Sequence, residues 1–212
     1  NNEKILIANF SIGKLGEENS ALLGAMFVTK LWQAAVARAT LPEHERKDTY
    51  LYIDEFQNFA TDAFANILSE ARKYRLNLTV AHQYMSQLPE TVRSTIFGNV
   101  SSIISFRIGG EDASILEKEF KPAFSAEDFM NLDMRHFFIK MTIDGQTAIP
   151  FSGHTLNFPL PDEDLASDVV KISRQRWAKP KAEVEKEIAA QELISQEKSS
   201  GAESQSFSEP LV

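Results

Sequence analysis

Four short apolar runs, separated by stretches with a helical pattern, constrain the fold of this chain more than any other feature of its sequence. The runs cover residues 5–10, 50–53, 76–81 and 103–106. Each is too short for a buried helix and is rich in β-branched or aromatic residues, which is typical of strands. Because strands that alternate with helices usually pair in parallel under helices on both faces, the pattern predicts an α/β fold with a mostly parallel sheet.

The segments between the runs predict helices. Residues 19–39 are apolar nearly all round, so we expect this helix to be buried on more than one side. Residues 61–74 begin with a candidate capping residue, Thr61 or Asp62, and residues 89–97 predict a shorter helix. The predicted helix at residues 61–74 carries an apolar stripe formed by Phe64, Ile67, Leu68 and Ala71.

The C-terminal part of the sequence follows a different pattern. Asp144-Gly145 predicts a tight hairpin turn, and Ser125, followed by Asp128, predicts a capped helix start. The predicted elements are helices at 114–120 and 125–132, hairpin strands at 136–143 and 146–151, and helices at 162–177 and 181–196. Because the composition turns polar at residue 199, we expect a disordered tail over residues 199–212. Before this tail we expect a domain over residues 1–158 and a helical appendage over 159–198.

The composition excludes several classes of protein and site. With 30 acidic and 22 basic residues the chain carries a net charge of −8, so nucleic-acid contact needs a local basic strip or a central channel. The absence of cysteine excludes disulfides and thiolate metal sites. No apolar run approaches the roughly 18 residues of a membrane span, and no signal peptide opens the chain. Because the chain starts at Asn1, just before the first run, we expect a piece of a longer protein.

Two adjacent acids, Asp54 and Glu55, follow the second apolar run. Open α/β sheets bind ligands at the carboxyl ends of their strands, so this is the expected place for a site. In a nucleoside triphosphatase, Asp54 would hold Mg²⁺ and Glu55 would polarise the attacking water. The alternative is that the acids only mark where the strand leaves the core for solvent.

The third run ends at His82 and Gln83. A glutamine amide both donates and accepts hydrogen bonds, so Gln83 is suited to contact a γ-phosphate or to orient water. An exposed loop glutamine is the alternative. With four histidines and no cysteine no zinc site assembles, and we expect His82 to be exposed or at the core edge.

Arg72 and Arg107 are the candidate phosphate-binding cations. Arg72 lies off the apolar stripe of its helix, beside Lys73. It is either a solvated basic helix end that suits the helix dipole or an arginine presented to the phosphates of a neighbouring subunit. Arg107 follows the fourth run and is either a structural ion-pair partner or a phosphate contact.

The phosphate-binding P-loop, in which glycine and four further residues precede Gly-Lys-Ser/Thr, is absent from this sequence. Gly13-Lys14 is the only Gly-Lys pair, but Ala8 stands at the leading glycine and Leu15 at the serine or threonine. On its own, therefore, the chain is not expected to hold a nucleotide in the usual way.

Four segments, in this order, resemble the C-terminal half of the motor domain of HerA/FtsK-type ATPases, and in particular the TraG/TraD-like conjugative coupling proteins of type IV secretion. The segments are Leu51–Phe56, Ala71–Tyr74, Thr79–Gln83 and Phe106–Asp112. The resemblance implies a RecA-like core that binds ATP and Mg²⁺. In it, Asp54 matches the Mg²⁺-linked Walker B acid and Glu55 the water-activating acid. Gln83 matches the polar sensor residue, and Arg72 matches the arginine finger.

The resemblance also implies a homo-oligomeric ring, usually a hexamer, that hydrolyses ATP to move DNA through a central pore. Such proteins commonly carry an N-terminal membrane anchor, so we expect the complete protein in the cytoplasm, at the cytoplasmic face of the inner membrane. Secretion-channel or relaxase proteins are further expected partners. Because the P-loop half is absent here, we expect truncation and an inactive fragment.

Other functions stay open on the sequence alone. A HerA-like helicase in DNA processing or defence would share the same residues. A non-catalytic ring or scaffold subunit would keep the fold without a P-loop. An unrelated α/β enzyme would need another nucleophile or metal cluster, which the sequence does not show.

Overall fold

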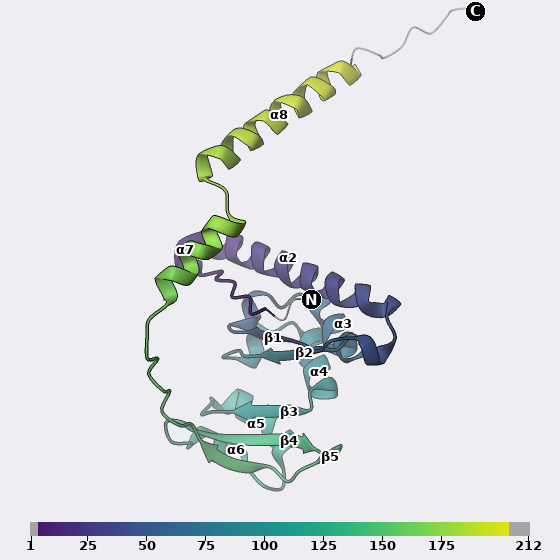
Figure 1. Ribbon diagram of the computed structural model, residues 1–212. Coiled ribbons are helices and arrows are strands. Elements are labelled where there is room, and N and C mark those ends of the chain that lie inside the picture. Colours follow the sequence, from purple (N-terminus) through teal and green to yellow (C-terminus); the bar gives the residue numbers. More distant parts are fainter. Residues whose placement is uncertain (1–3, 204–212) are drawn as a thin grey trace, which may run out of the picture. The chain divides into compact units, whose positions relative to one another are not determined.

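The computed structural model describes residues 4–203, with residues 62, 63 and 194–203 described by their backbone only. The chain divides into two compact units, Asn1–Leu156 and Asn157–Val212. The first unit contains helices together with parallel and antiparallel strand pairs (Figure 1), so the predicted α/β class is confirmed.

The first unit alternates helices and strands before it ends in antiparallel strands. Its helices are α1 (Ile12–Leu15), α2 (Glu17–Val36), α3 (Asp62–Glu70), α4 (Glu90–Asn99), α5 (Gly110–Phe120) and α6 (Ala126–Met130). Its strands are β1 (Thr49–Ile53), β2 (Leu76–Val80), β3 (Ser102–Ser105), β4 (His136–Ile143), β5 (Gln146–Thr147) and β6 (Phe151–His154). Short 3-10 turns are η1 (Ala37–Thr40), η2 (Glu43–Glu45), η3 (Phe56–Asn58), η4 (Ala71–Tyr74) and η5 (Met85–Gln87).

Strands β1 and β2 form the predicted parallel pair, with Ile53 opposite Val80 at its carboxyl end. The backbone ladder continues past the strands, because the Ala81 N–H donates to the Ile53 carbonyl and the Phe56 N–H donates to the Ala81 carbonyl. Ile53 is buried, whereas Tyr52, which points to the opposite face, is 72% exposed. One face of this pair therefore packs in the core and the other is open, unlike the two covered faces that were expected.

Strand β3 does not join this parallel pair. It pairs antiparallel with β4, and β4 also pairs with β5 and β6. The structure thus differs from one mostly parallel sheet, because the predicted hairpin lays β4 along an edge of β3. The hairpin turn itself is confirmed: Asp144 and Gly145 both have positive φ, 49° and 79°.

Residues 5–10 do not form the predicted strand. Residues 5–9 are exposed and Phe10 is half-buried, and with β1 and α2 these residues line a cavity of about 1630 Å³. A strand requires backbone pairing with a neighbour, and β1 is hydrogen-bonded to β2 alone among the described residues. The prediction of a strand at residues 5–10 is therefore wrong, because these residues have no strand to pair with.

Helix α2 is buried on one narrow face rather than on several sides, so that prediction is wrong. The buried positions are small or β-branched: Ser20, Gly24, Val28 and Ala35. Its large residues Leu22, Leu23 and Met26 are exposed. Gly24 is required at the contact, since a Cβ there would lie 2.1 Å from the Phe59 ring.

By length and composition, residues 17–40 also qualify as a candidate membrane span, with a mean hydropathy of 1.3 and 22% of that window buried. The expectation that nothing in the chain approaches a span is wrong by this criterion. Core helices of soluble proteins reach the same length and hydropathy, so the finding alone assigns no membrane role.

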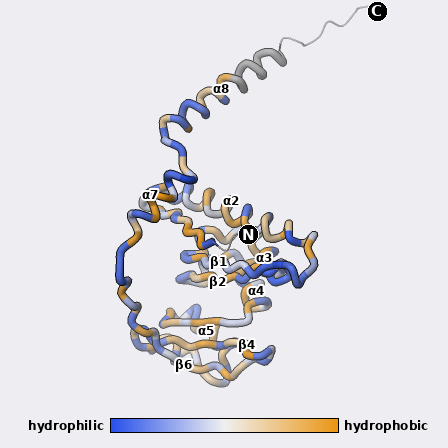
Figure 2. The backbone as a smooth tube through the Cα atoms, viewed as in Figure 1, coloured by the Kyte–Doolittle hydropathy of each residue, from blue (hydrophilic) through white to orange (hydrophobic). Residues whose placement is uncertain are grey.

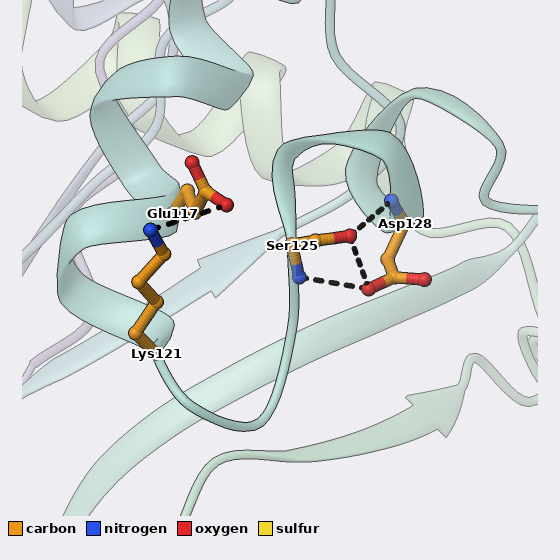
Figure 3. Close-up of polar contacts among 4 residues, drawn as sticks. All are labelled: Glu117, Lys121, Ser125 and Asp128. Carbon is orange, nitrogen blue, oxygen red and sulfur yellow. Dashed lines mark hydrogen bonds and ion pairs between the residues drawn. The ribbon is translucent and has the colours of Figure 1, made fainter.

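A capping interaction at Ser125 starts α6 after the chain leaves α5 (Figure 3). The Ser125 N–H donates to the Asp128 carboxylate at 2.7 Å, and the Asp128 N–H donates to the Ser125 hydroxyl at 3.4 Å, which confirms the predicted cap. Hydrogen bonds from the backbone and then the hydroxyl of Ser125 lower the pKa of Asp128. An ion pair of 3.5 Å joins Glu117 to Lys121 at the end of α5.

An aromatic cluster fastens the antiparallel sheet to these two helices. Phe138 of β4 stacks on Phe124 at 3.7 Å between ring centres and meets Phe129 edge-on at 5.1 Å. Hydrophobic residues accordingly run through β4 in Figure 2. The sheet is therefore held from the α5–α6 side by ring packing.

The second unit contains α7 (Ala166–Trp177) and α8 (Lys181–Glu203), in the positions predicted for helices. Helix α7 has no buried residue, and the first turns of α8 are hydrophilic (Figure 2). Residues 199–203, expected to be disordered, belong to α8. The rest of the predicted tail, residues 204–212, lies outside the described residues.

Candidate active site

Glu55 and Gln83, which lie 28 residues apart in sequence, meet at the carboxyl ends of β1 and β2. The Gln83 amide nitrogen donates to Glu55 Oε1 at 2.7 Å. The meeting follows from the parallel pairing, because parallel strands deliver their carboxyl ends to the same edge. The acid and the amide therefore lie at one edge of the strand pair, while their contact with a ligand stays a prediction.

The strained backbone of Glu55 helps to place its carboxylate at this strand edge. Glu55 has φ 49° and ψ 44°, the left-handed region that non-glycine residues rarely occupy. The turn lets Phe56 enter the core, where it is fully buried and packs 4.6 Å from the Phe64 ring. Strain of this kind costs about 1–3 kcal/mol and is typical of functional sites.

A second glutamine holds the other carboxylate oxygen of Glu55. The Gln57 amide nitrogen donates to Glu55 Oε2 at 2.5 Å. Both oxygens of Glu55 therefore have an amide donor, and each oxygen keeps a further lone pair for a water molecule. The arrangement orients the carboxylate without neutralising it.

Asp54 lies beside this pair and is exposed. Its Oδ1 accepts the backbone N–H of Glu55 at 3.0 Å, which leaves the rest of the carboxylate open. Mg²⁺ bound to a nucleotide often takes only one or two protein carboxylates, with phosphates and waters as its other ligands. Asp54 fits that role, although the described residues contain no group of three or more metal-binding side chains.

Arg107 lies on the segment that connects β3 to α5. It is exposed, and within the described part of the chain its side chain has no hydrogen bond or ion pair. Five residues further on, Asp112 accepts the backbone N–H of Met85 at 3.2 Å, in the loop that follows β2. The segment carrying Arg107 is thereby tied to the loop that carries Gln83.

Arg72 lies away from these residues. It belongs to η4, immediately before β2 begins, so the length of β2 separates it from Gln83. Five residues of a strand span about 16 Å. Arg72 is exposed, and its guanidinium has no partner among the residues that the structure describes. Within one chain it therefore does not reach Glu55, although it remains available to another molecule.

His82 is partly buried at the edge of the core, which is one of the two positions predicted for it. Burial lowers its pKa, against the opposing effects of a hydrogen bond with the Tyr84 backbone and the charge of Asp112. Its Nδ1 atom is buried and has no hydrogen-bond partner in the described structure. His82 is therefore neutral at pH 7 and forms part of the packing behind Gln83.

Sequence reasoning missed Gln57 and Asp112 as parts of this edge. Gln57 follows the two acids after a buried phenylalanine, and only the turn of η3 brings its amide back to Glu55. Asp112 follows Glu111 in the first turn of α5, where either acid suits the helix dipole. The helical period nevertheless places Asp112, and not Glu111, on the same side as the buried Leu116 and Phe120, and that spacing is the signal that could have found it.

Comparison with known families matches residues 48–118 to the family described as the TraM recognition site of TraD and TraG. The matched segment runs from just before β1 into α5 and contains Asp54, Glu55, Arg72, Gln83 and Arg107. A search of curated protein sequences found no match.

Similar solved structures include two of the coupling protein TrwB. One is the bacterial conjugative coupling protein TrwBdeltaN70 in its unbound monoclinic form, with a TM-score of 0.43 and 16% identity over 53% of this chain and 33% of that chain. The other is the plasmid coupling protein TrwB in complex with the non-hydrolysable ATP analogue ADPNP, with a TM-score of 0.47 and 15% identity over 64% and 36%. This chain thus spans about a third of the length of the structures it matches. Over residues 48–118 the chain is similar to this family of TraD and TraG proteins.

Proposed function

We propose that this chain is part of an ATP-driven DNA translocase, a coupling protein of conjugation or type IV secretion. The complete protein forms a homo-oligomeric ring, a hexamer in this proposal, that hydrolyses ATP with Mg²⁺ and moves DNA through its central pore. The single observation that carries the proposal is the 2.7 Å hydrogen bond between Gln83 and Glu55 at one strand edge.

The roles of the site residues belong to this proposal. Asp54 holds Mg²⁺, Glu55 accepts a proton from the attacking water, and Gln83 contacts the terminal phosphate. Arg107 adds a cation on the same side, and Arg72 serves the site of the neighbouring subunit. The chain has no P-loop, so the phosphate-binding half comes from a segment outside it, and the fragment alone is inactive.

Location and partners follow from the same proposal. An anchor outside this chain holds the ring at the cytoplasmic face of the inner membrane, where relaxase and secretion-channel proteins meet it. The family model is described as a TraM recognition site, and this favours a second role in which the surface of residues 48–118 binds a TraM-type protein. A binding assay with the TraM-type protein encoded beside this gene tests that role.

The decisive test is Glu55→Gln in the protein completed by its upstream coding sequence. Removing the carboxylate should leave ATP binding intact and lower the hydrolysis rate about 10²–10⁴-fold. Glu18→Gln, an exposed position far along the chain from the site, is the control and should keep the parental rate. Normal turnover by Glu55→Gln would remove Glu55 from the mechanism. An inactive parent would favour the scaffold alternative.

A further inference from the structure

Asp112 has no part in the proposed chemistry, yet it is the one charged residue classed as buried among the side chains that the structure describes. It is 8% exposed and lies in the first turn of α5. A buried carboxylate is costly unless it is hydrogen-bonded or compensated by other charges. Its presence in the core therefore calls for a specific partner.

That partner is the loop that carries Gln83. Asp112 Oδ2 accepts the backbone N–H of Met85, two residues after Gln83, at 3.2 Å. The charge of Asp112 also acts on His82, the residue immediately before Gln83. Asp112 thus interacts with the chain on both sides of Gln83.

Other contacts hold the two ends of this loop. Ala81 is held by the ladder to β1, and the buried side chain of Met85 anchors the far end. Among the described residues, the hydrogen bond from the Met85 N–H to Asp112 is the one that ties the backbone of this loop to α5. The N-terminal end of α5 stabilises the negative charge of Asp112 through the helix dipole.

We propose that Asp112 is a positioning residue that fixes the loop of Gln83 against Glu55. The inference rests on the proposed function, because it treats Gln83 and Glu55 as parts of one nucleotide site. It also implies that Arg107, on the segment leading into α5, moves together with Gln83. The three segments that approach the site then form one rigid edge.

The test uses Asp112→Ala and Asp112→Leu, neither of which can accept the Met85 N–H, with Glu111→Gln as the matched control. Glu111 is exposed and carries the same charge at the adjacent position of the same helix turn. In NMR spectra of this chain, Asp112→Ala should lower the hydrogen-exchange protection of the Met85 amide at least about tenfold. The side-chain amide resonances of Gln83 should shift as well. Glu111→Gln should leave both unchanged.

In the completed protein, Asp112→Leu should lower kcat about tenfold or more while KM for ATP changes less than about threefold. A residue with only a structural role would lower stability without this difference between kcat and KM. The double variant Gln83→Ala/Asp112→Leu should be no slower than Gln83→Ala alone, because both act through one contact. Should either Asp112 variant not fold, the other carries the same measurements.

Unchanged Gln83 resonances in a folded Asp112 variant would overturn the inference, whatever the ATPase assay gives. Parental kcat in Asp112→Leu would overturn it as well. An inactive completed parent would instead refute the proposed function, and the NMR result would still decide whether Asp112 positions the Gln83 loop.

Discussion

Glu55 is the residue at which backbone conformation and side-chain chemistry coincide. Its left-handed backbone turns Phe56 into the core, and its carboxylate receives an amide hydrogen bond from each of two glutamines. The sequence predicted the acid and Gln83. The catalytic roles of these residues stay predictions that the Glu55→Gln experiment tests.

His82 makes the stability of this chain depend on pH. Burial lowers the pKa of His82 below its ordinary value of 6.5. The unfolded chain therefore binds a proton that the folded chain resists, and the free energy of unfolding should fall as pH drops from above 6.5 through the lowered folded pKa. Urea unfolding of the parent and His82→Gln at a series of pH values measures this dependence.

The variant should lose part of the decline that the parent shows over that range. His44→Gln is the control, because the His44 side chain is 81% exposed. It should keep the parental pH dependence. An identical decline in the parent and His82→Gln would exclude His82 as its source.

At the scale of elements, α2 depends on a close approach that only glycine permits. A Cβ at position 24 would lie 2.1 Å from the Phe59 ring, so Gly24→Ala should lower the free energy of unfolding by about 1–3 kcal/mol through overpacking. Gly98→Ala in α4 is the matched control, since no atom lies within 4 Å of its added Cβ. It should raise stability by about 0.5–1 kcal/mol, because alanine favours a helix. Equal effects in urea unfolding would contradict the contact.

The start of α6 depends on its cap. Ser125→Ala removes both hydroxyl contacts with Asp128 and should cost about 1 kcal/mol at pH 7, measured by urea unfolding. Because hydrogen bonds from Ser125 lower the pKa of Asp128 below 3.8, the part of this contribution that needs the ionised carboxylate is present above pH 3.8 and is lost as pH falls through the folded pKa.

Ser114→Ala provides the control for the cap. Its hydroxyl bonds the Gly110 carbonyl within α5 and caps no helix end. We expect a change of less than about 0.5 kcal/mol. A cost for Ser114→Ala equal to that for Ser125→Ala would show that the loss reflects any helix serine rather than the cap.

At the scale of the whole molecule, the free guanidinium of Arg72 predicts a site shared between subunits. In the completed protein, Arg72→Ala and Glu55→Gln should each be nearly inactive. An equal mixture should regain about a quarter of parental ATPase activity, because a quarter of random interfaces pair an intact Glu55 with an intact Arg72. Steady-state ATPase assays after subunit exchange measure this recovery.

The double variant Arg72→Ala/Glu55→Gln supplies the control for that experiment. Mixed with Arg72→Ala, it should restore nothing, since no interface then carries both residues. Absence of recovery in rings shown to be mixed would place Arg72 outside the active site.

The two units also predict where the chain tolerates truncation. Helix α7 contributes no buried residue, and the division falls between Leu156 and Asn157. Removing residues 157–212 should therefore leave cooperative unfolding and shift Tm by less than about 2 °C. Circular dichroism melts of both lengths measure this, and loss of the cooperative transition would show that the second unit supports the first.

The sequence by itself determined the local elements and the edge at which the site forms. Apolar runs and turn residues specify strands, helices and the Asp144-Gly145 hairpin, because these depend on periodicity and on the φ that each residue accepts. Parallel pairing of β1 and β2 then brings Glu55 and Gln83 together.

Only the tertiary structure decided which edges pair and which side chains are buried. Residues 5–10 have the composition of a strand without a pairing partner, and β3 pairs with β4 rather than with β2. Glu111 and Asp112 look alike in sequence, yet one is exposed and the other is buried against the Gln83 loop. Pairing and burial depend on atoms brought together from distant parts of the chain, and local sequence patterns do not encode those distances.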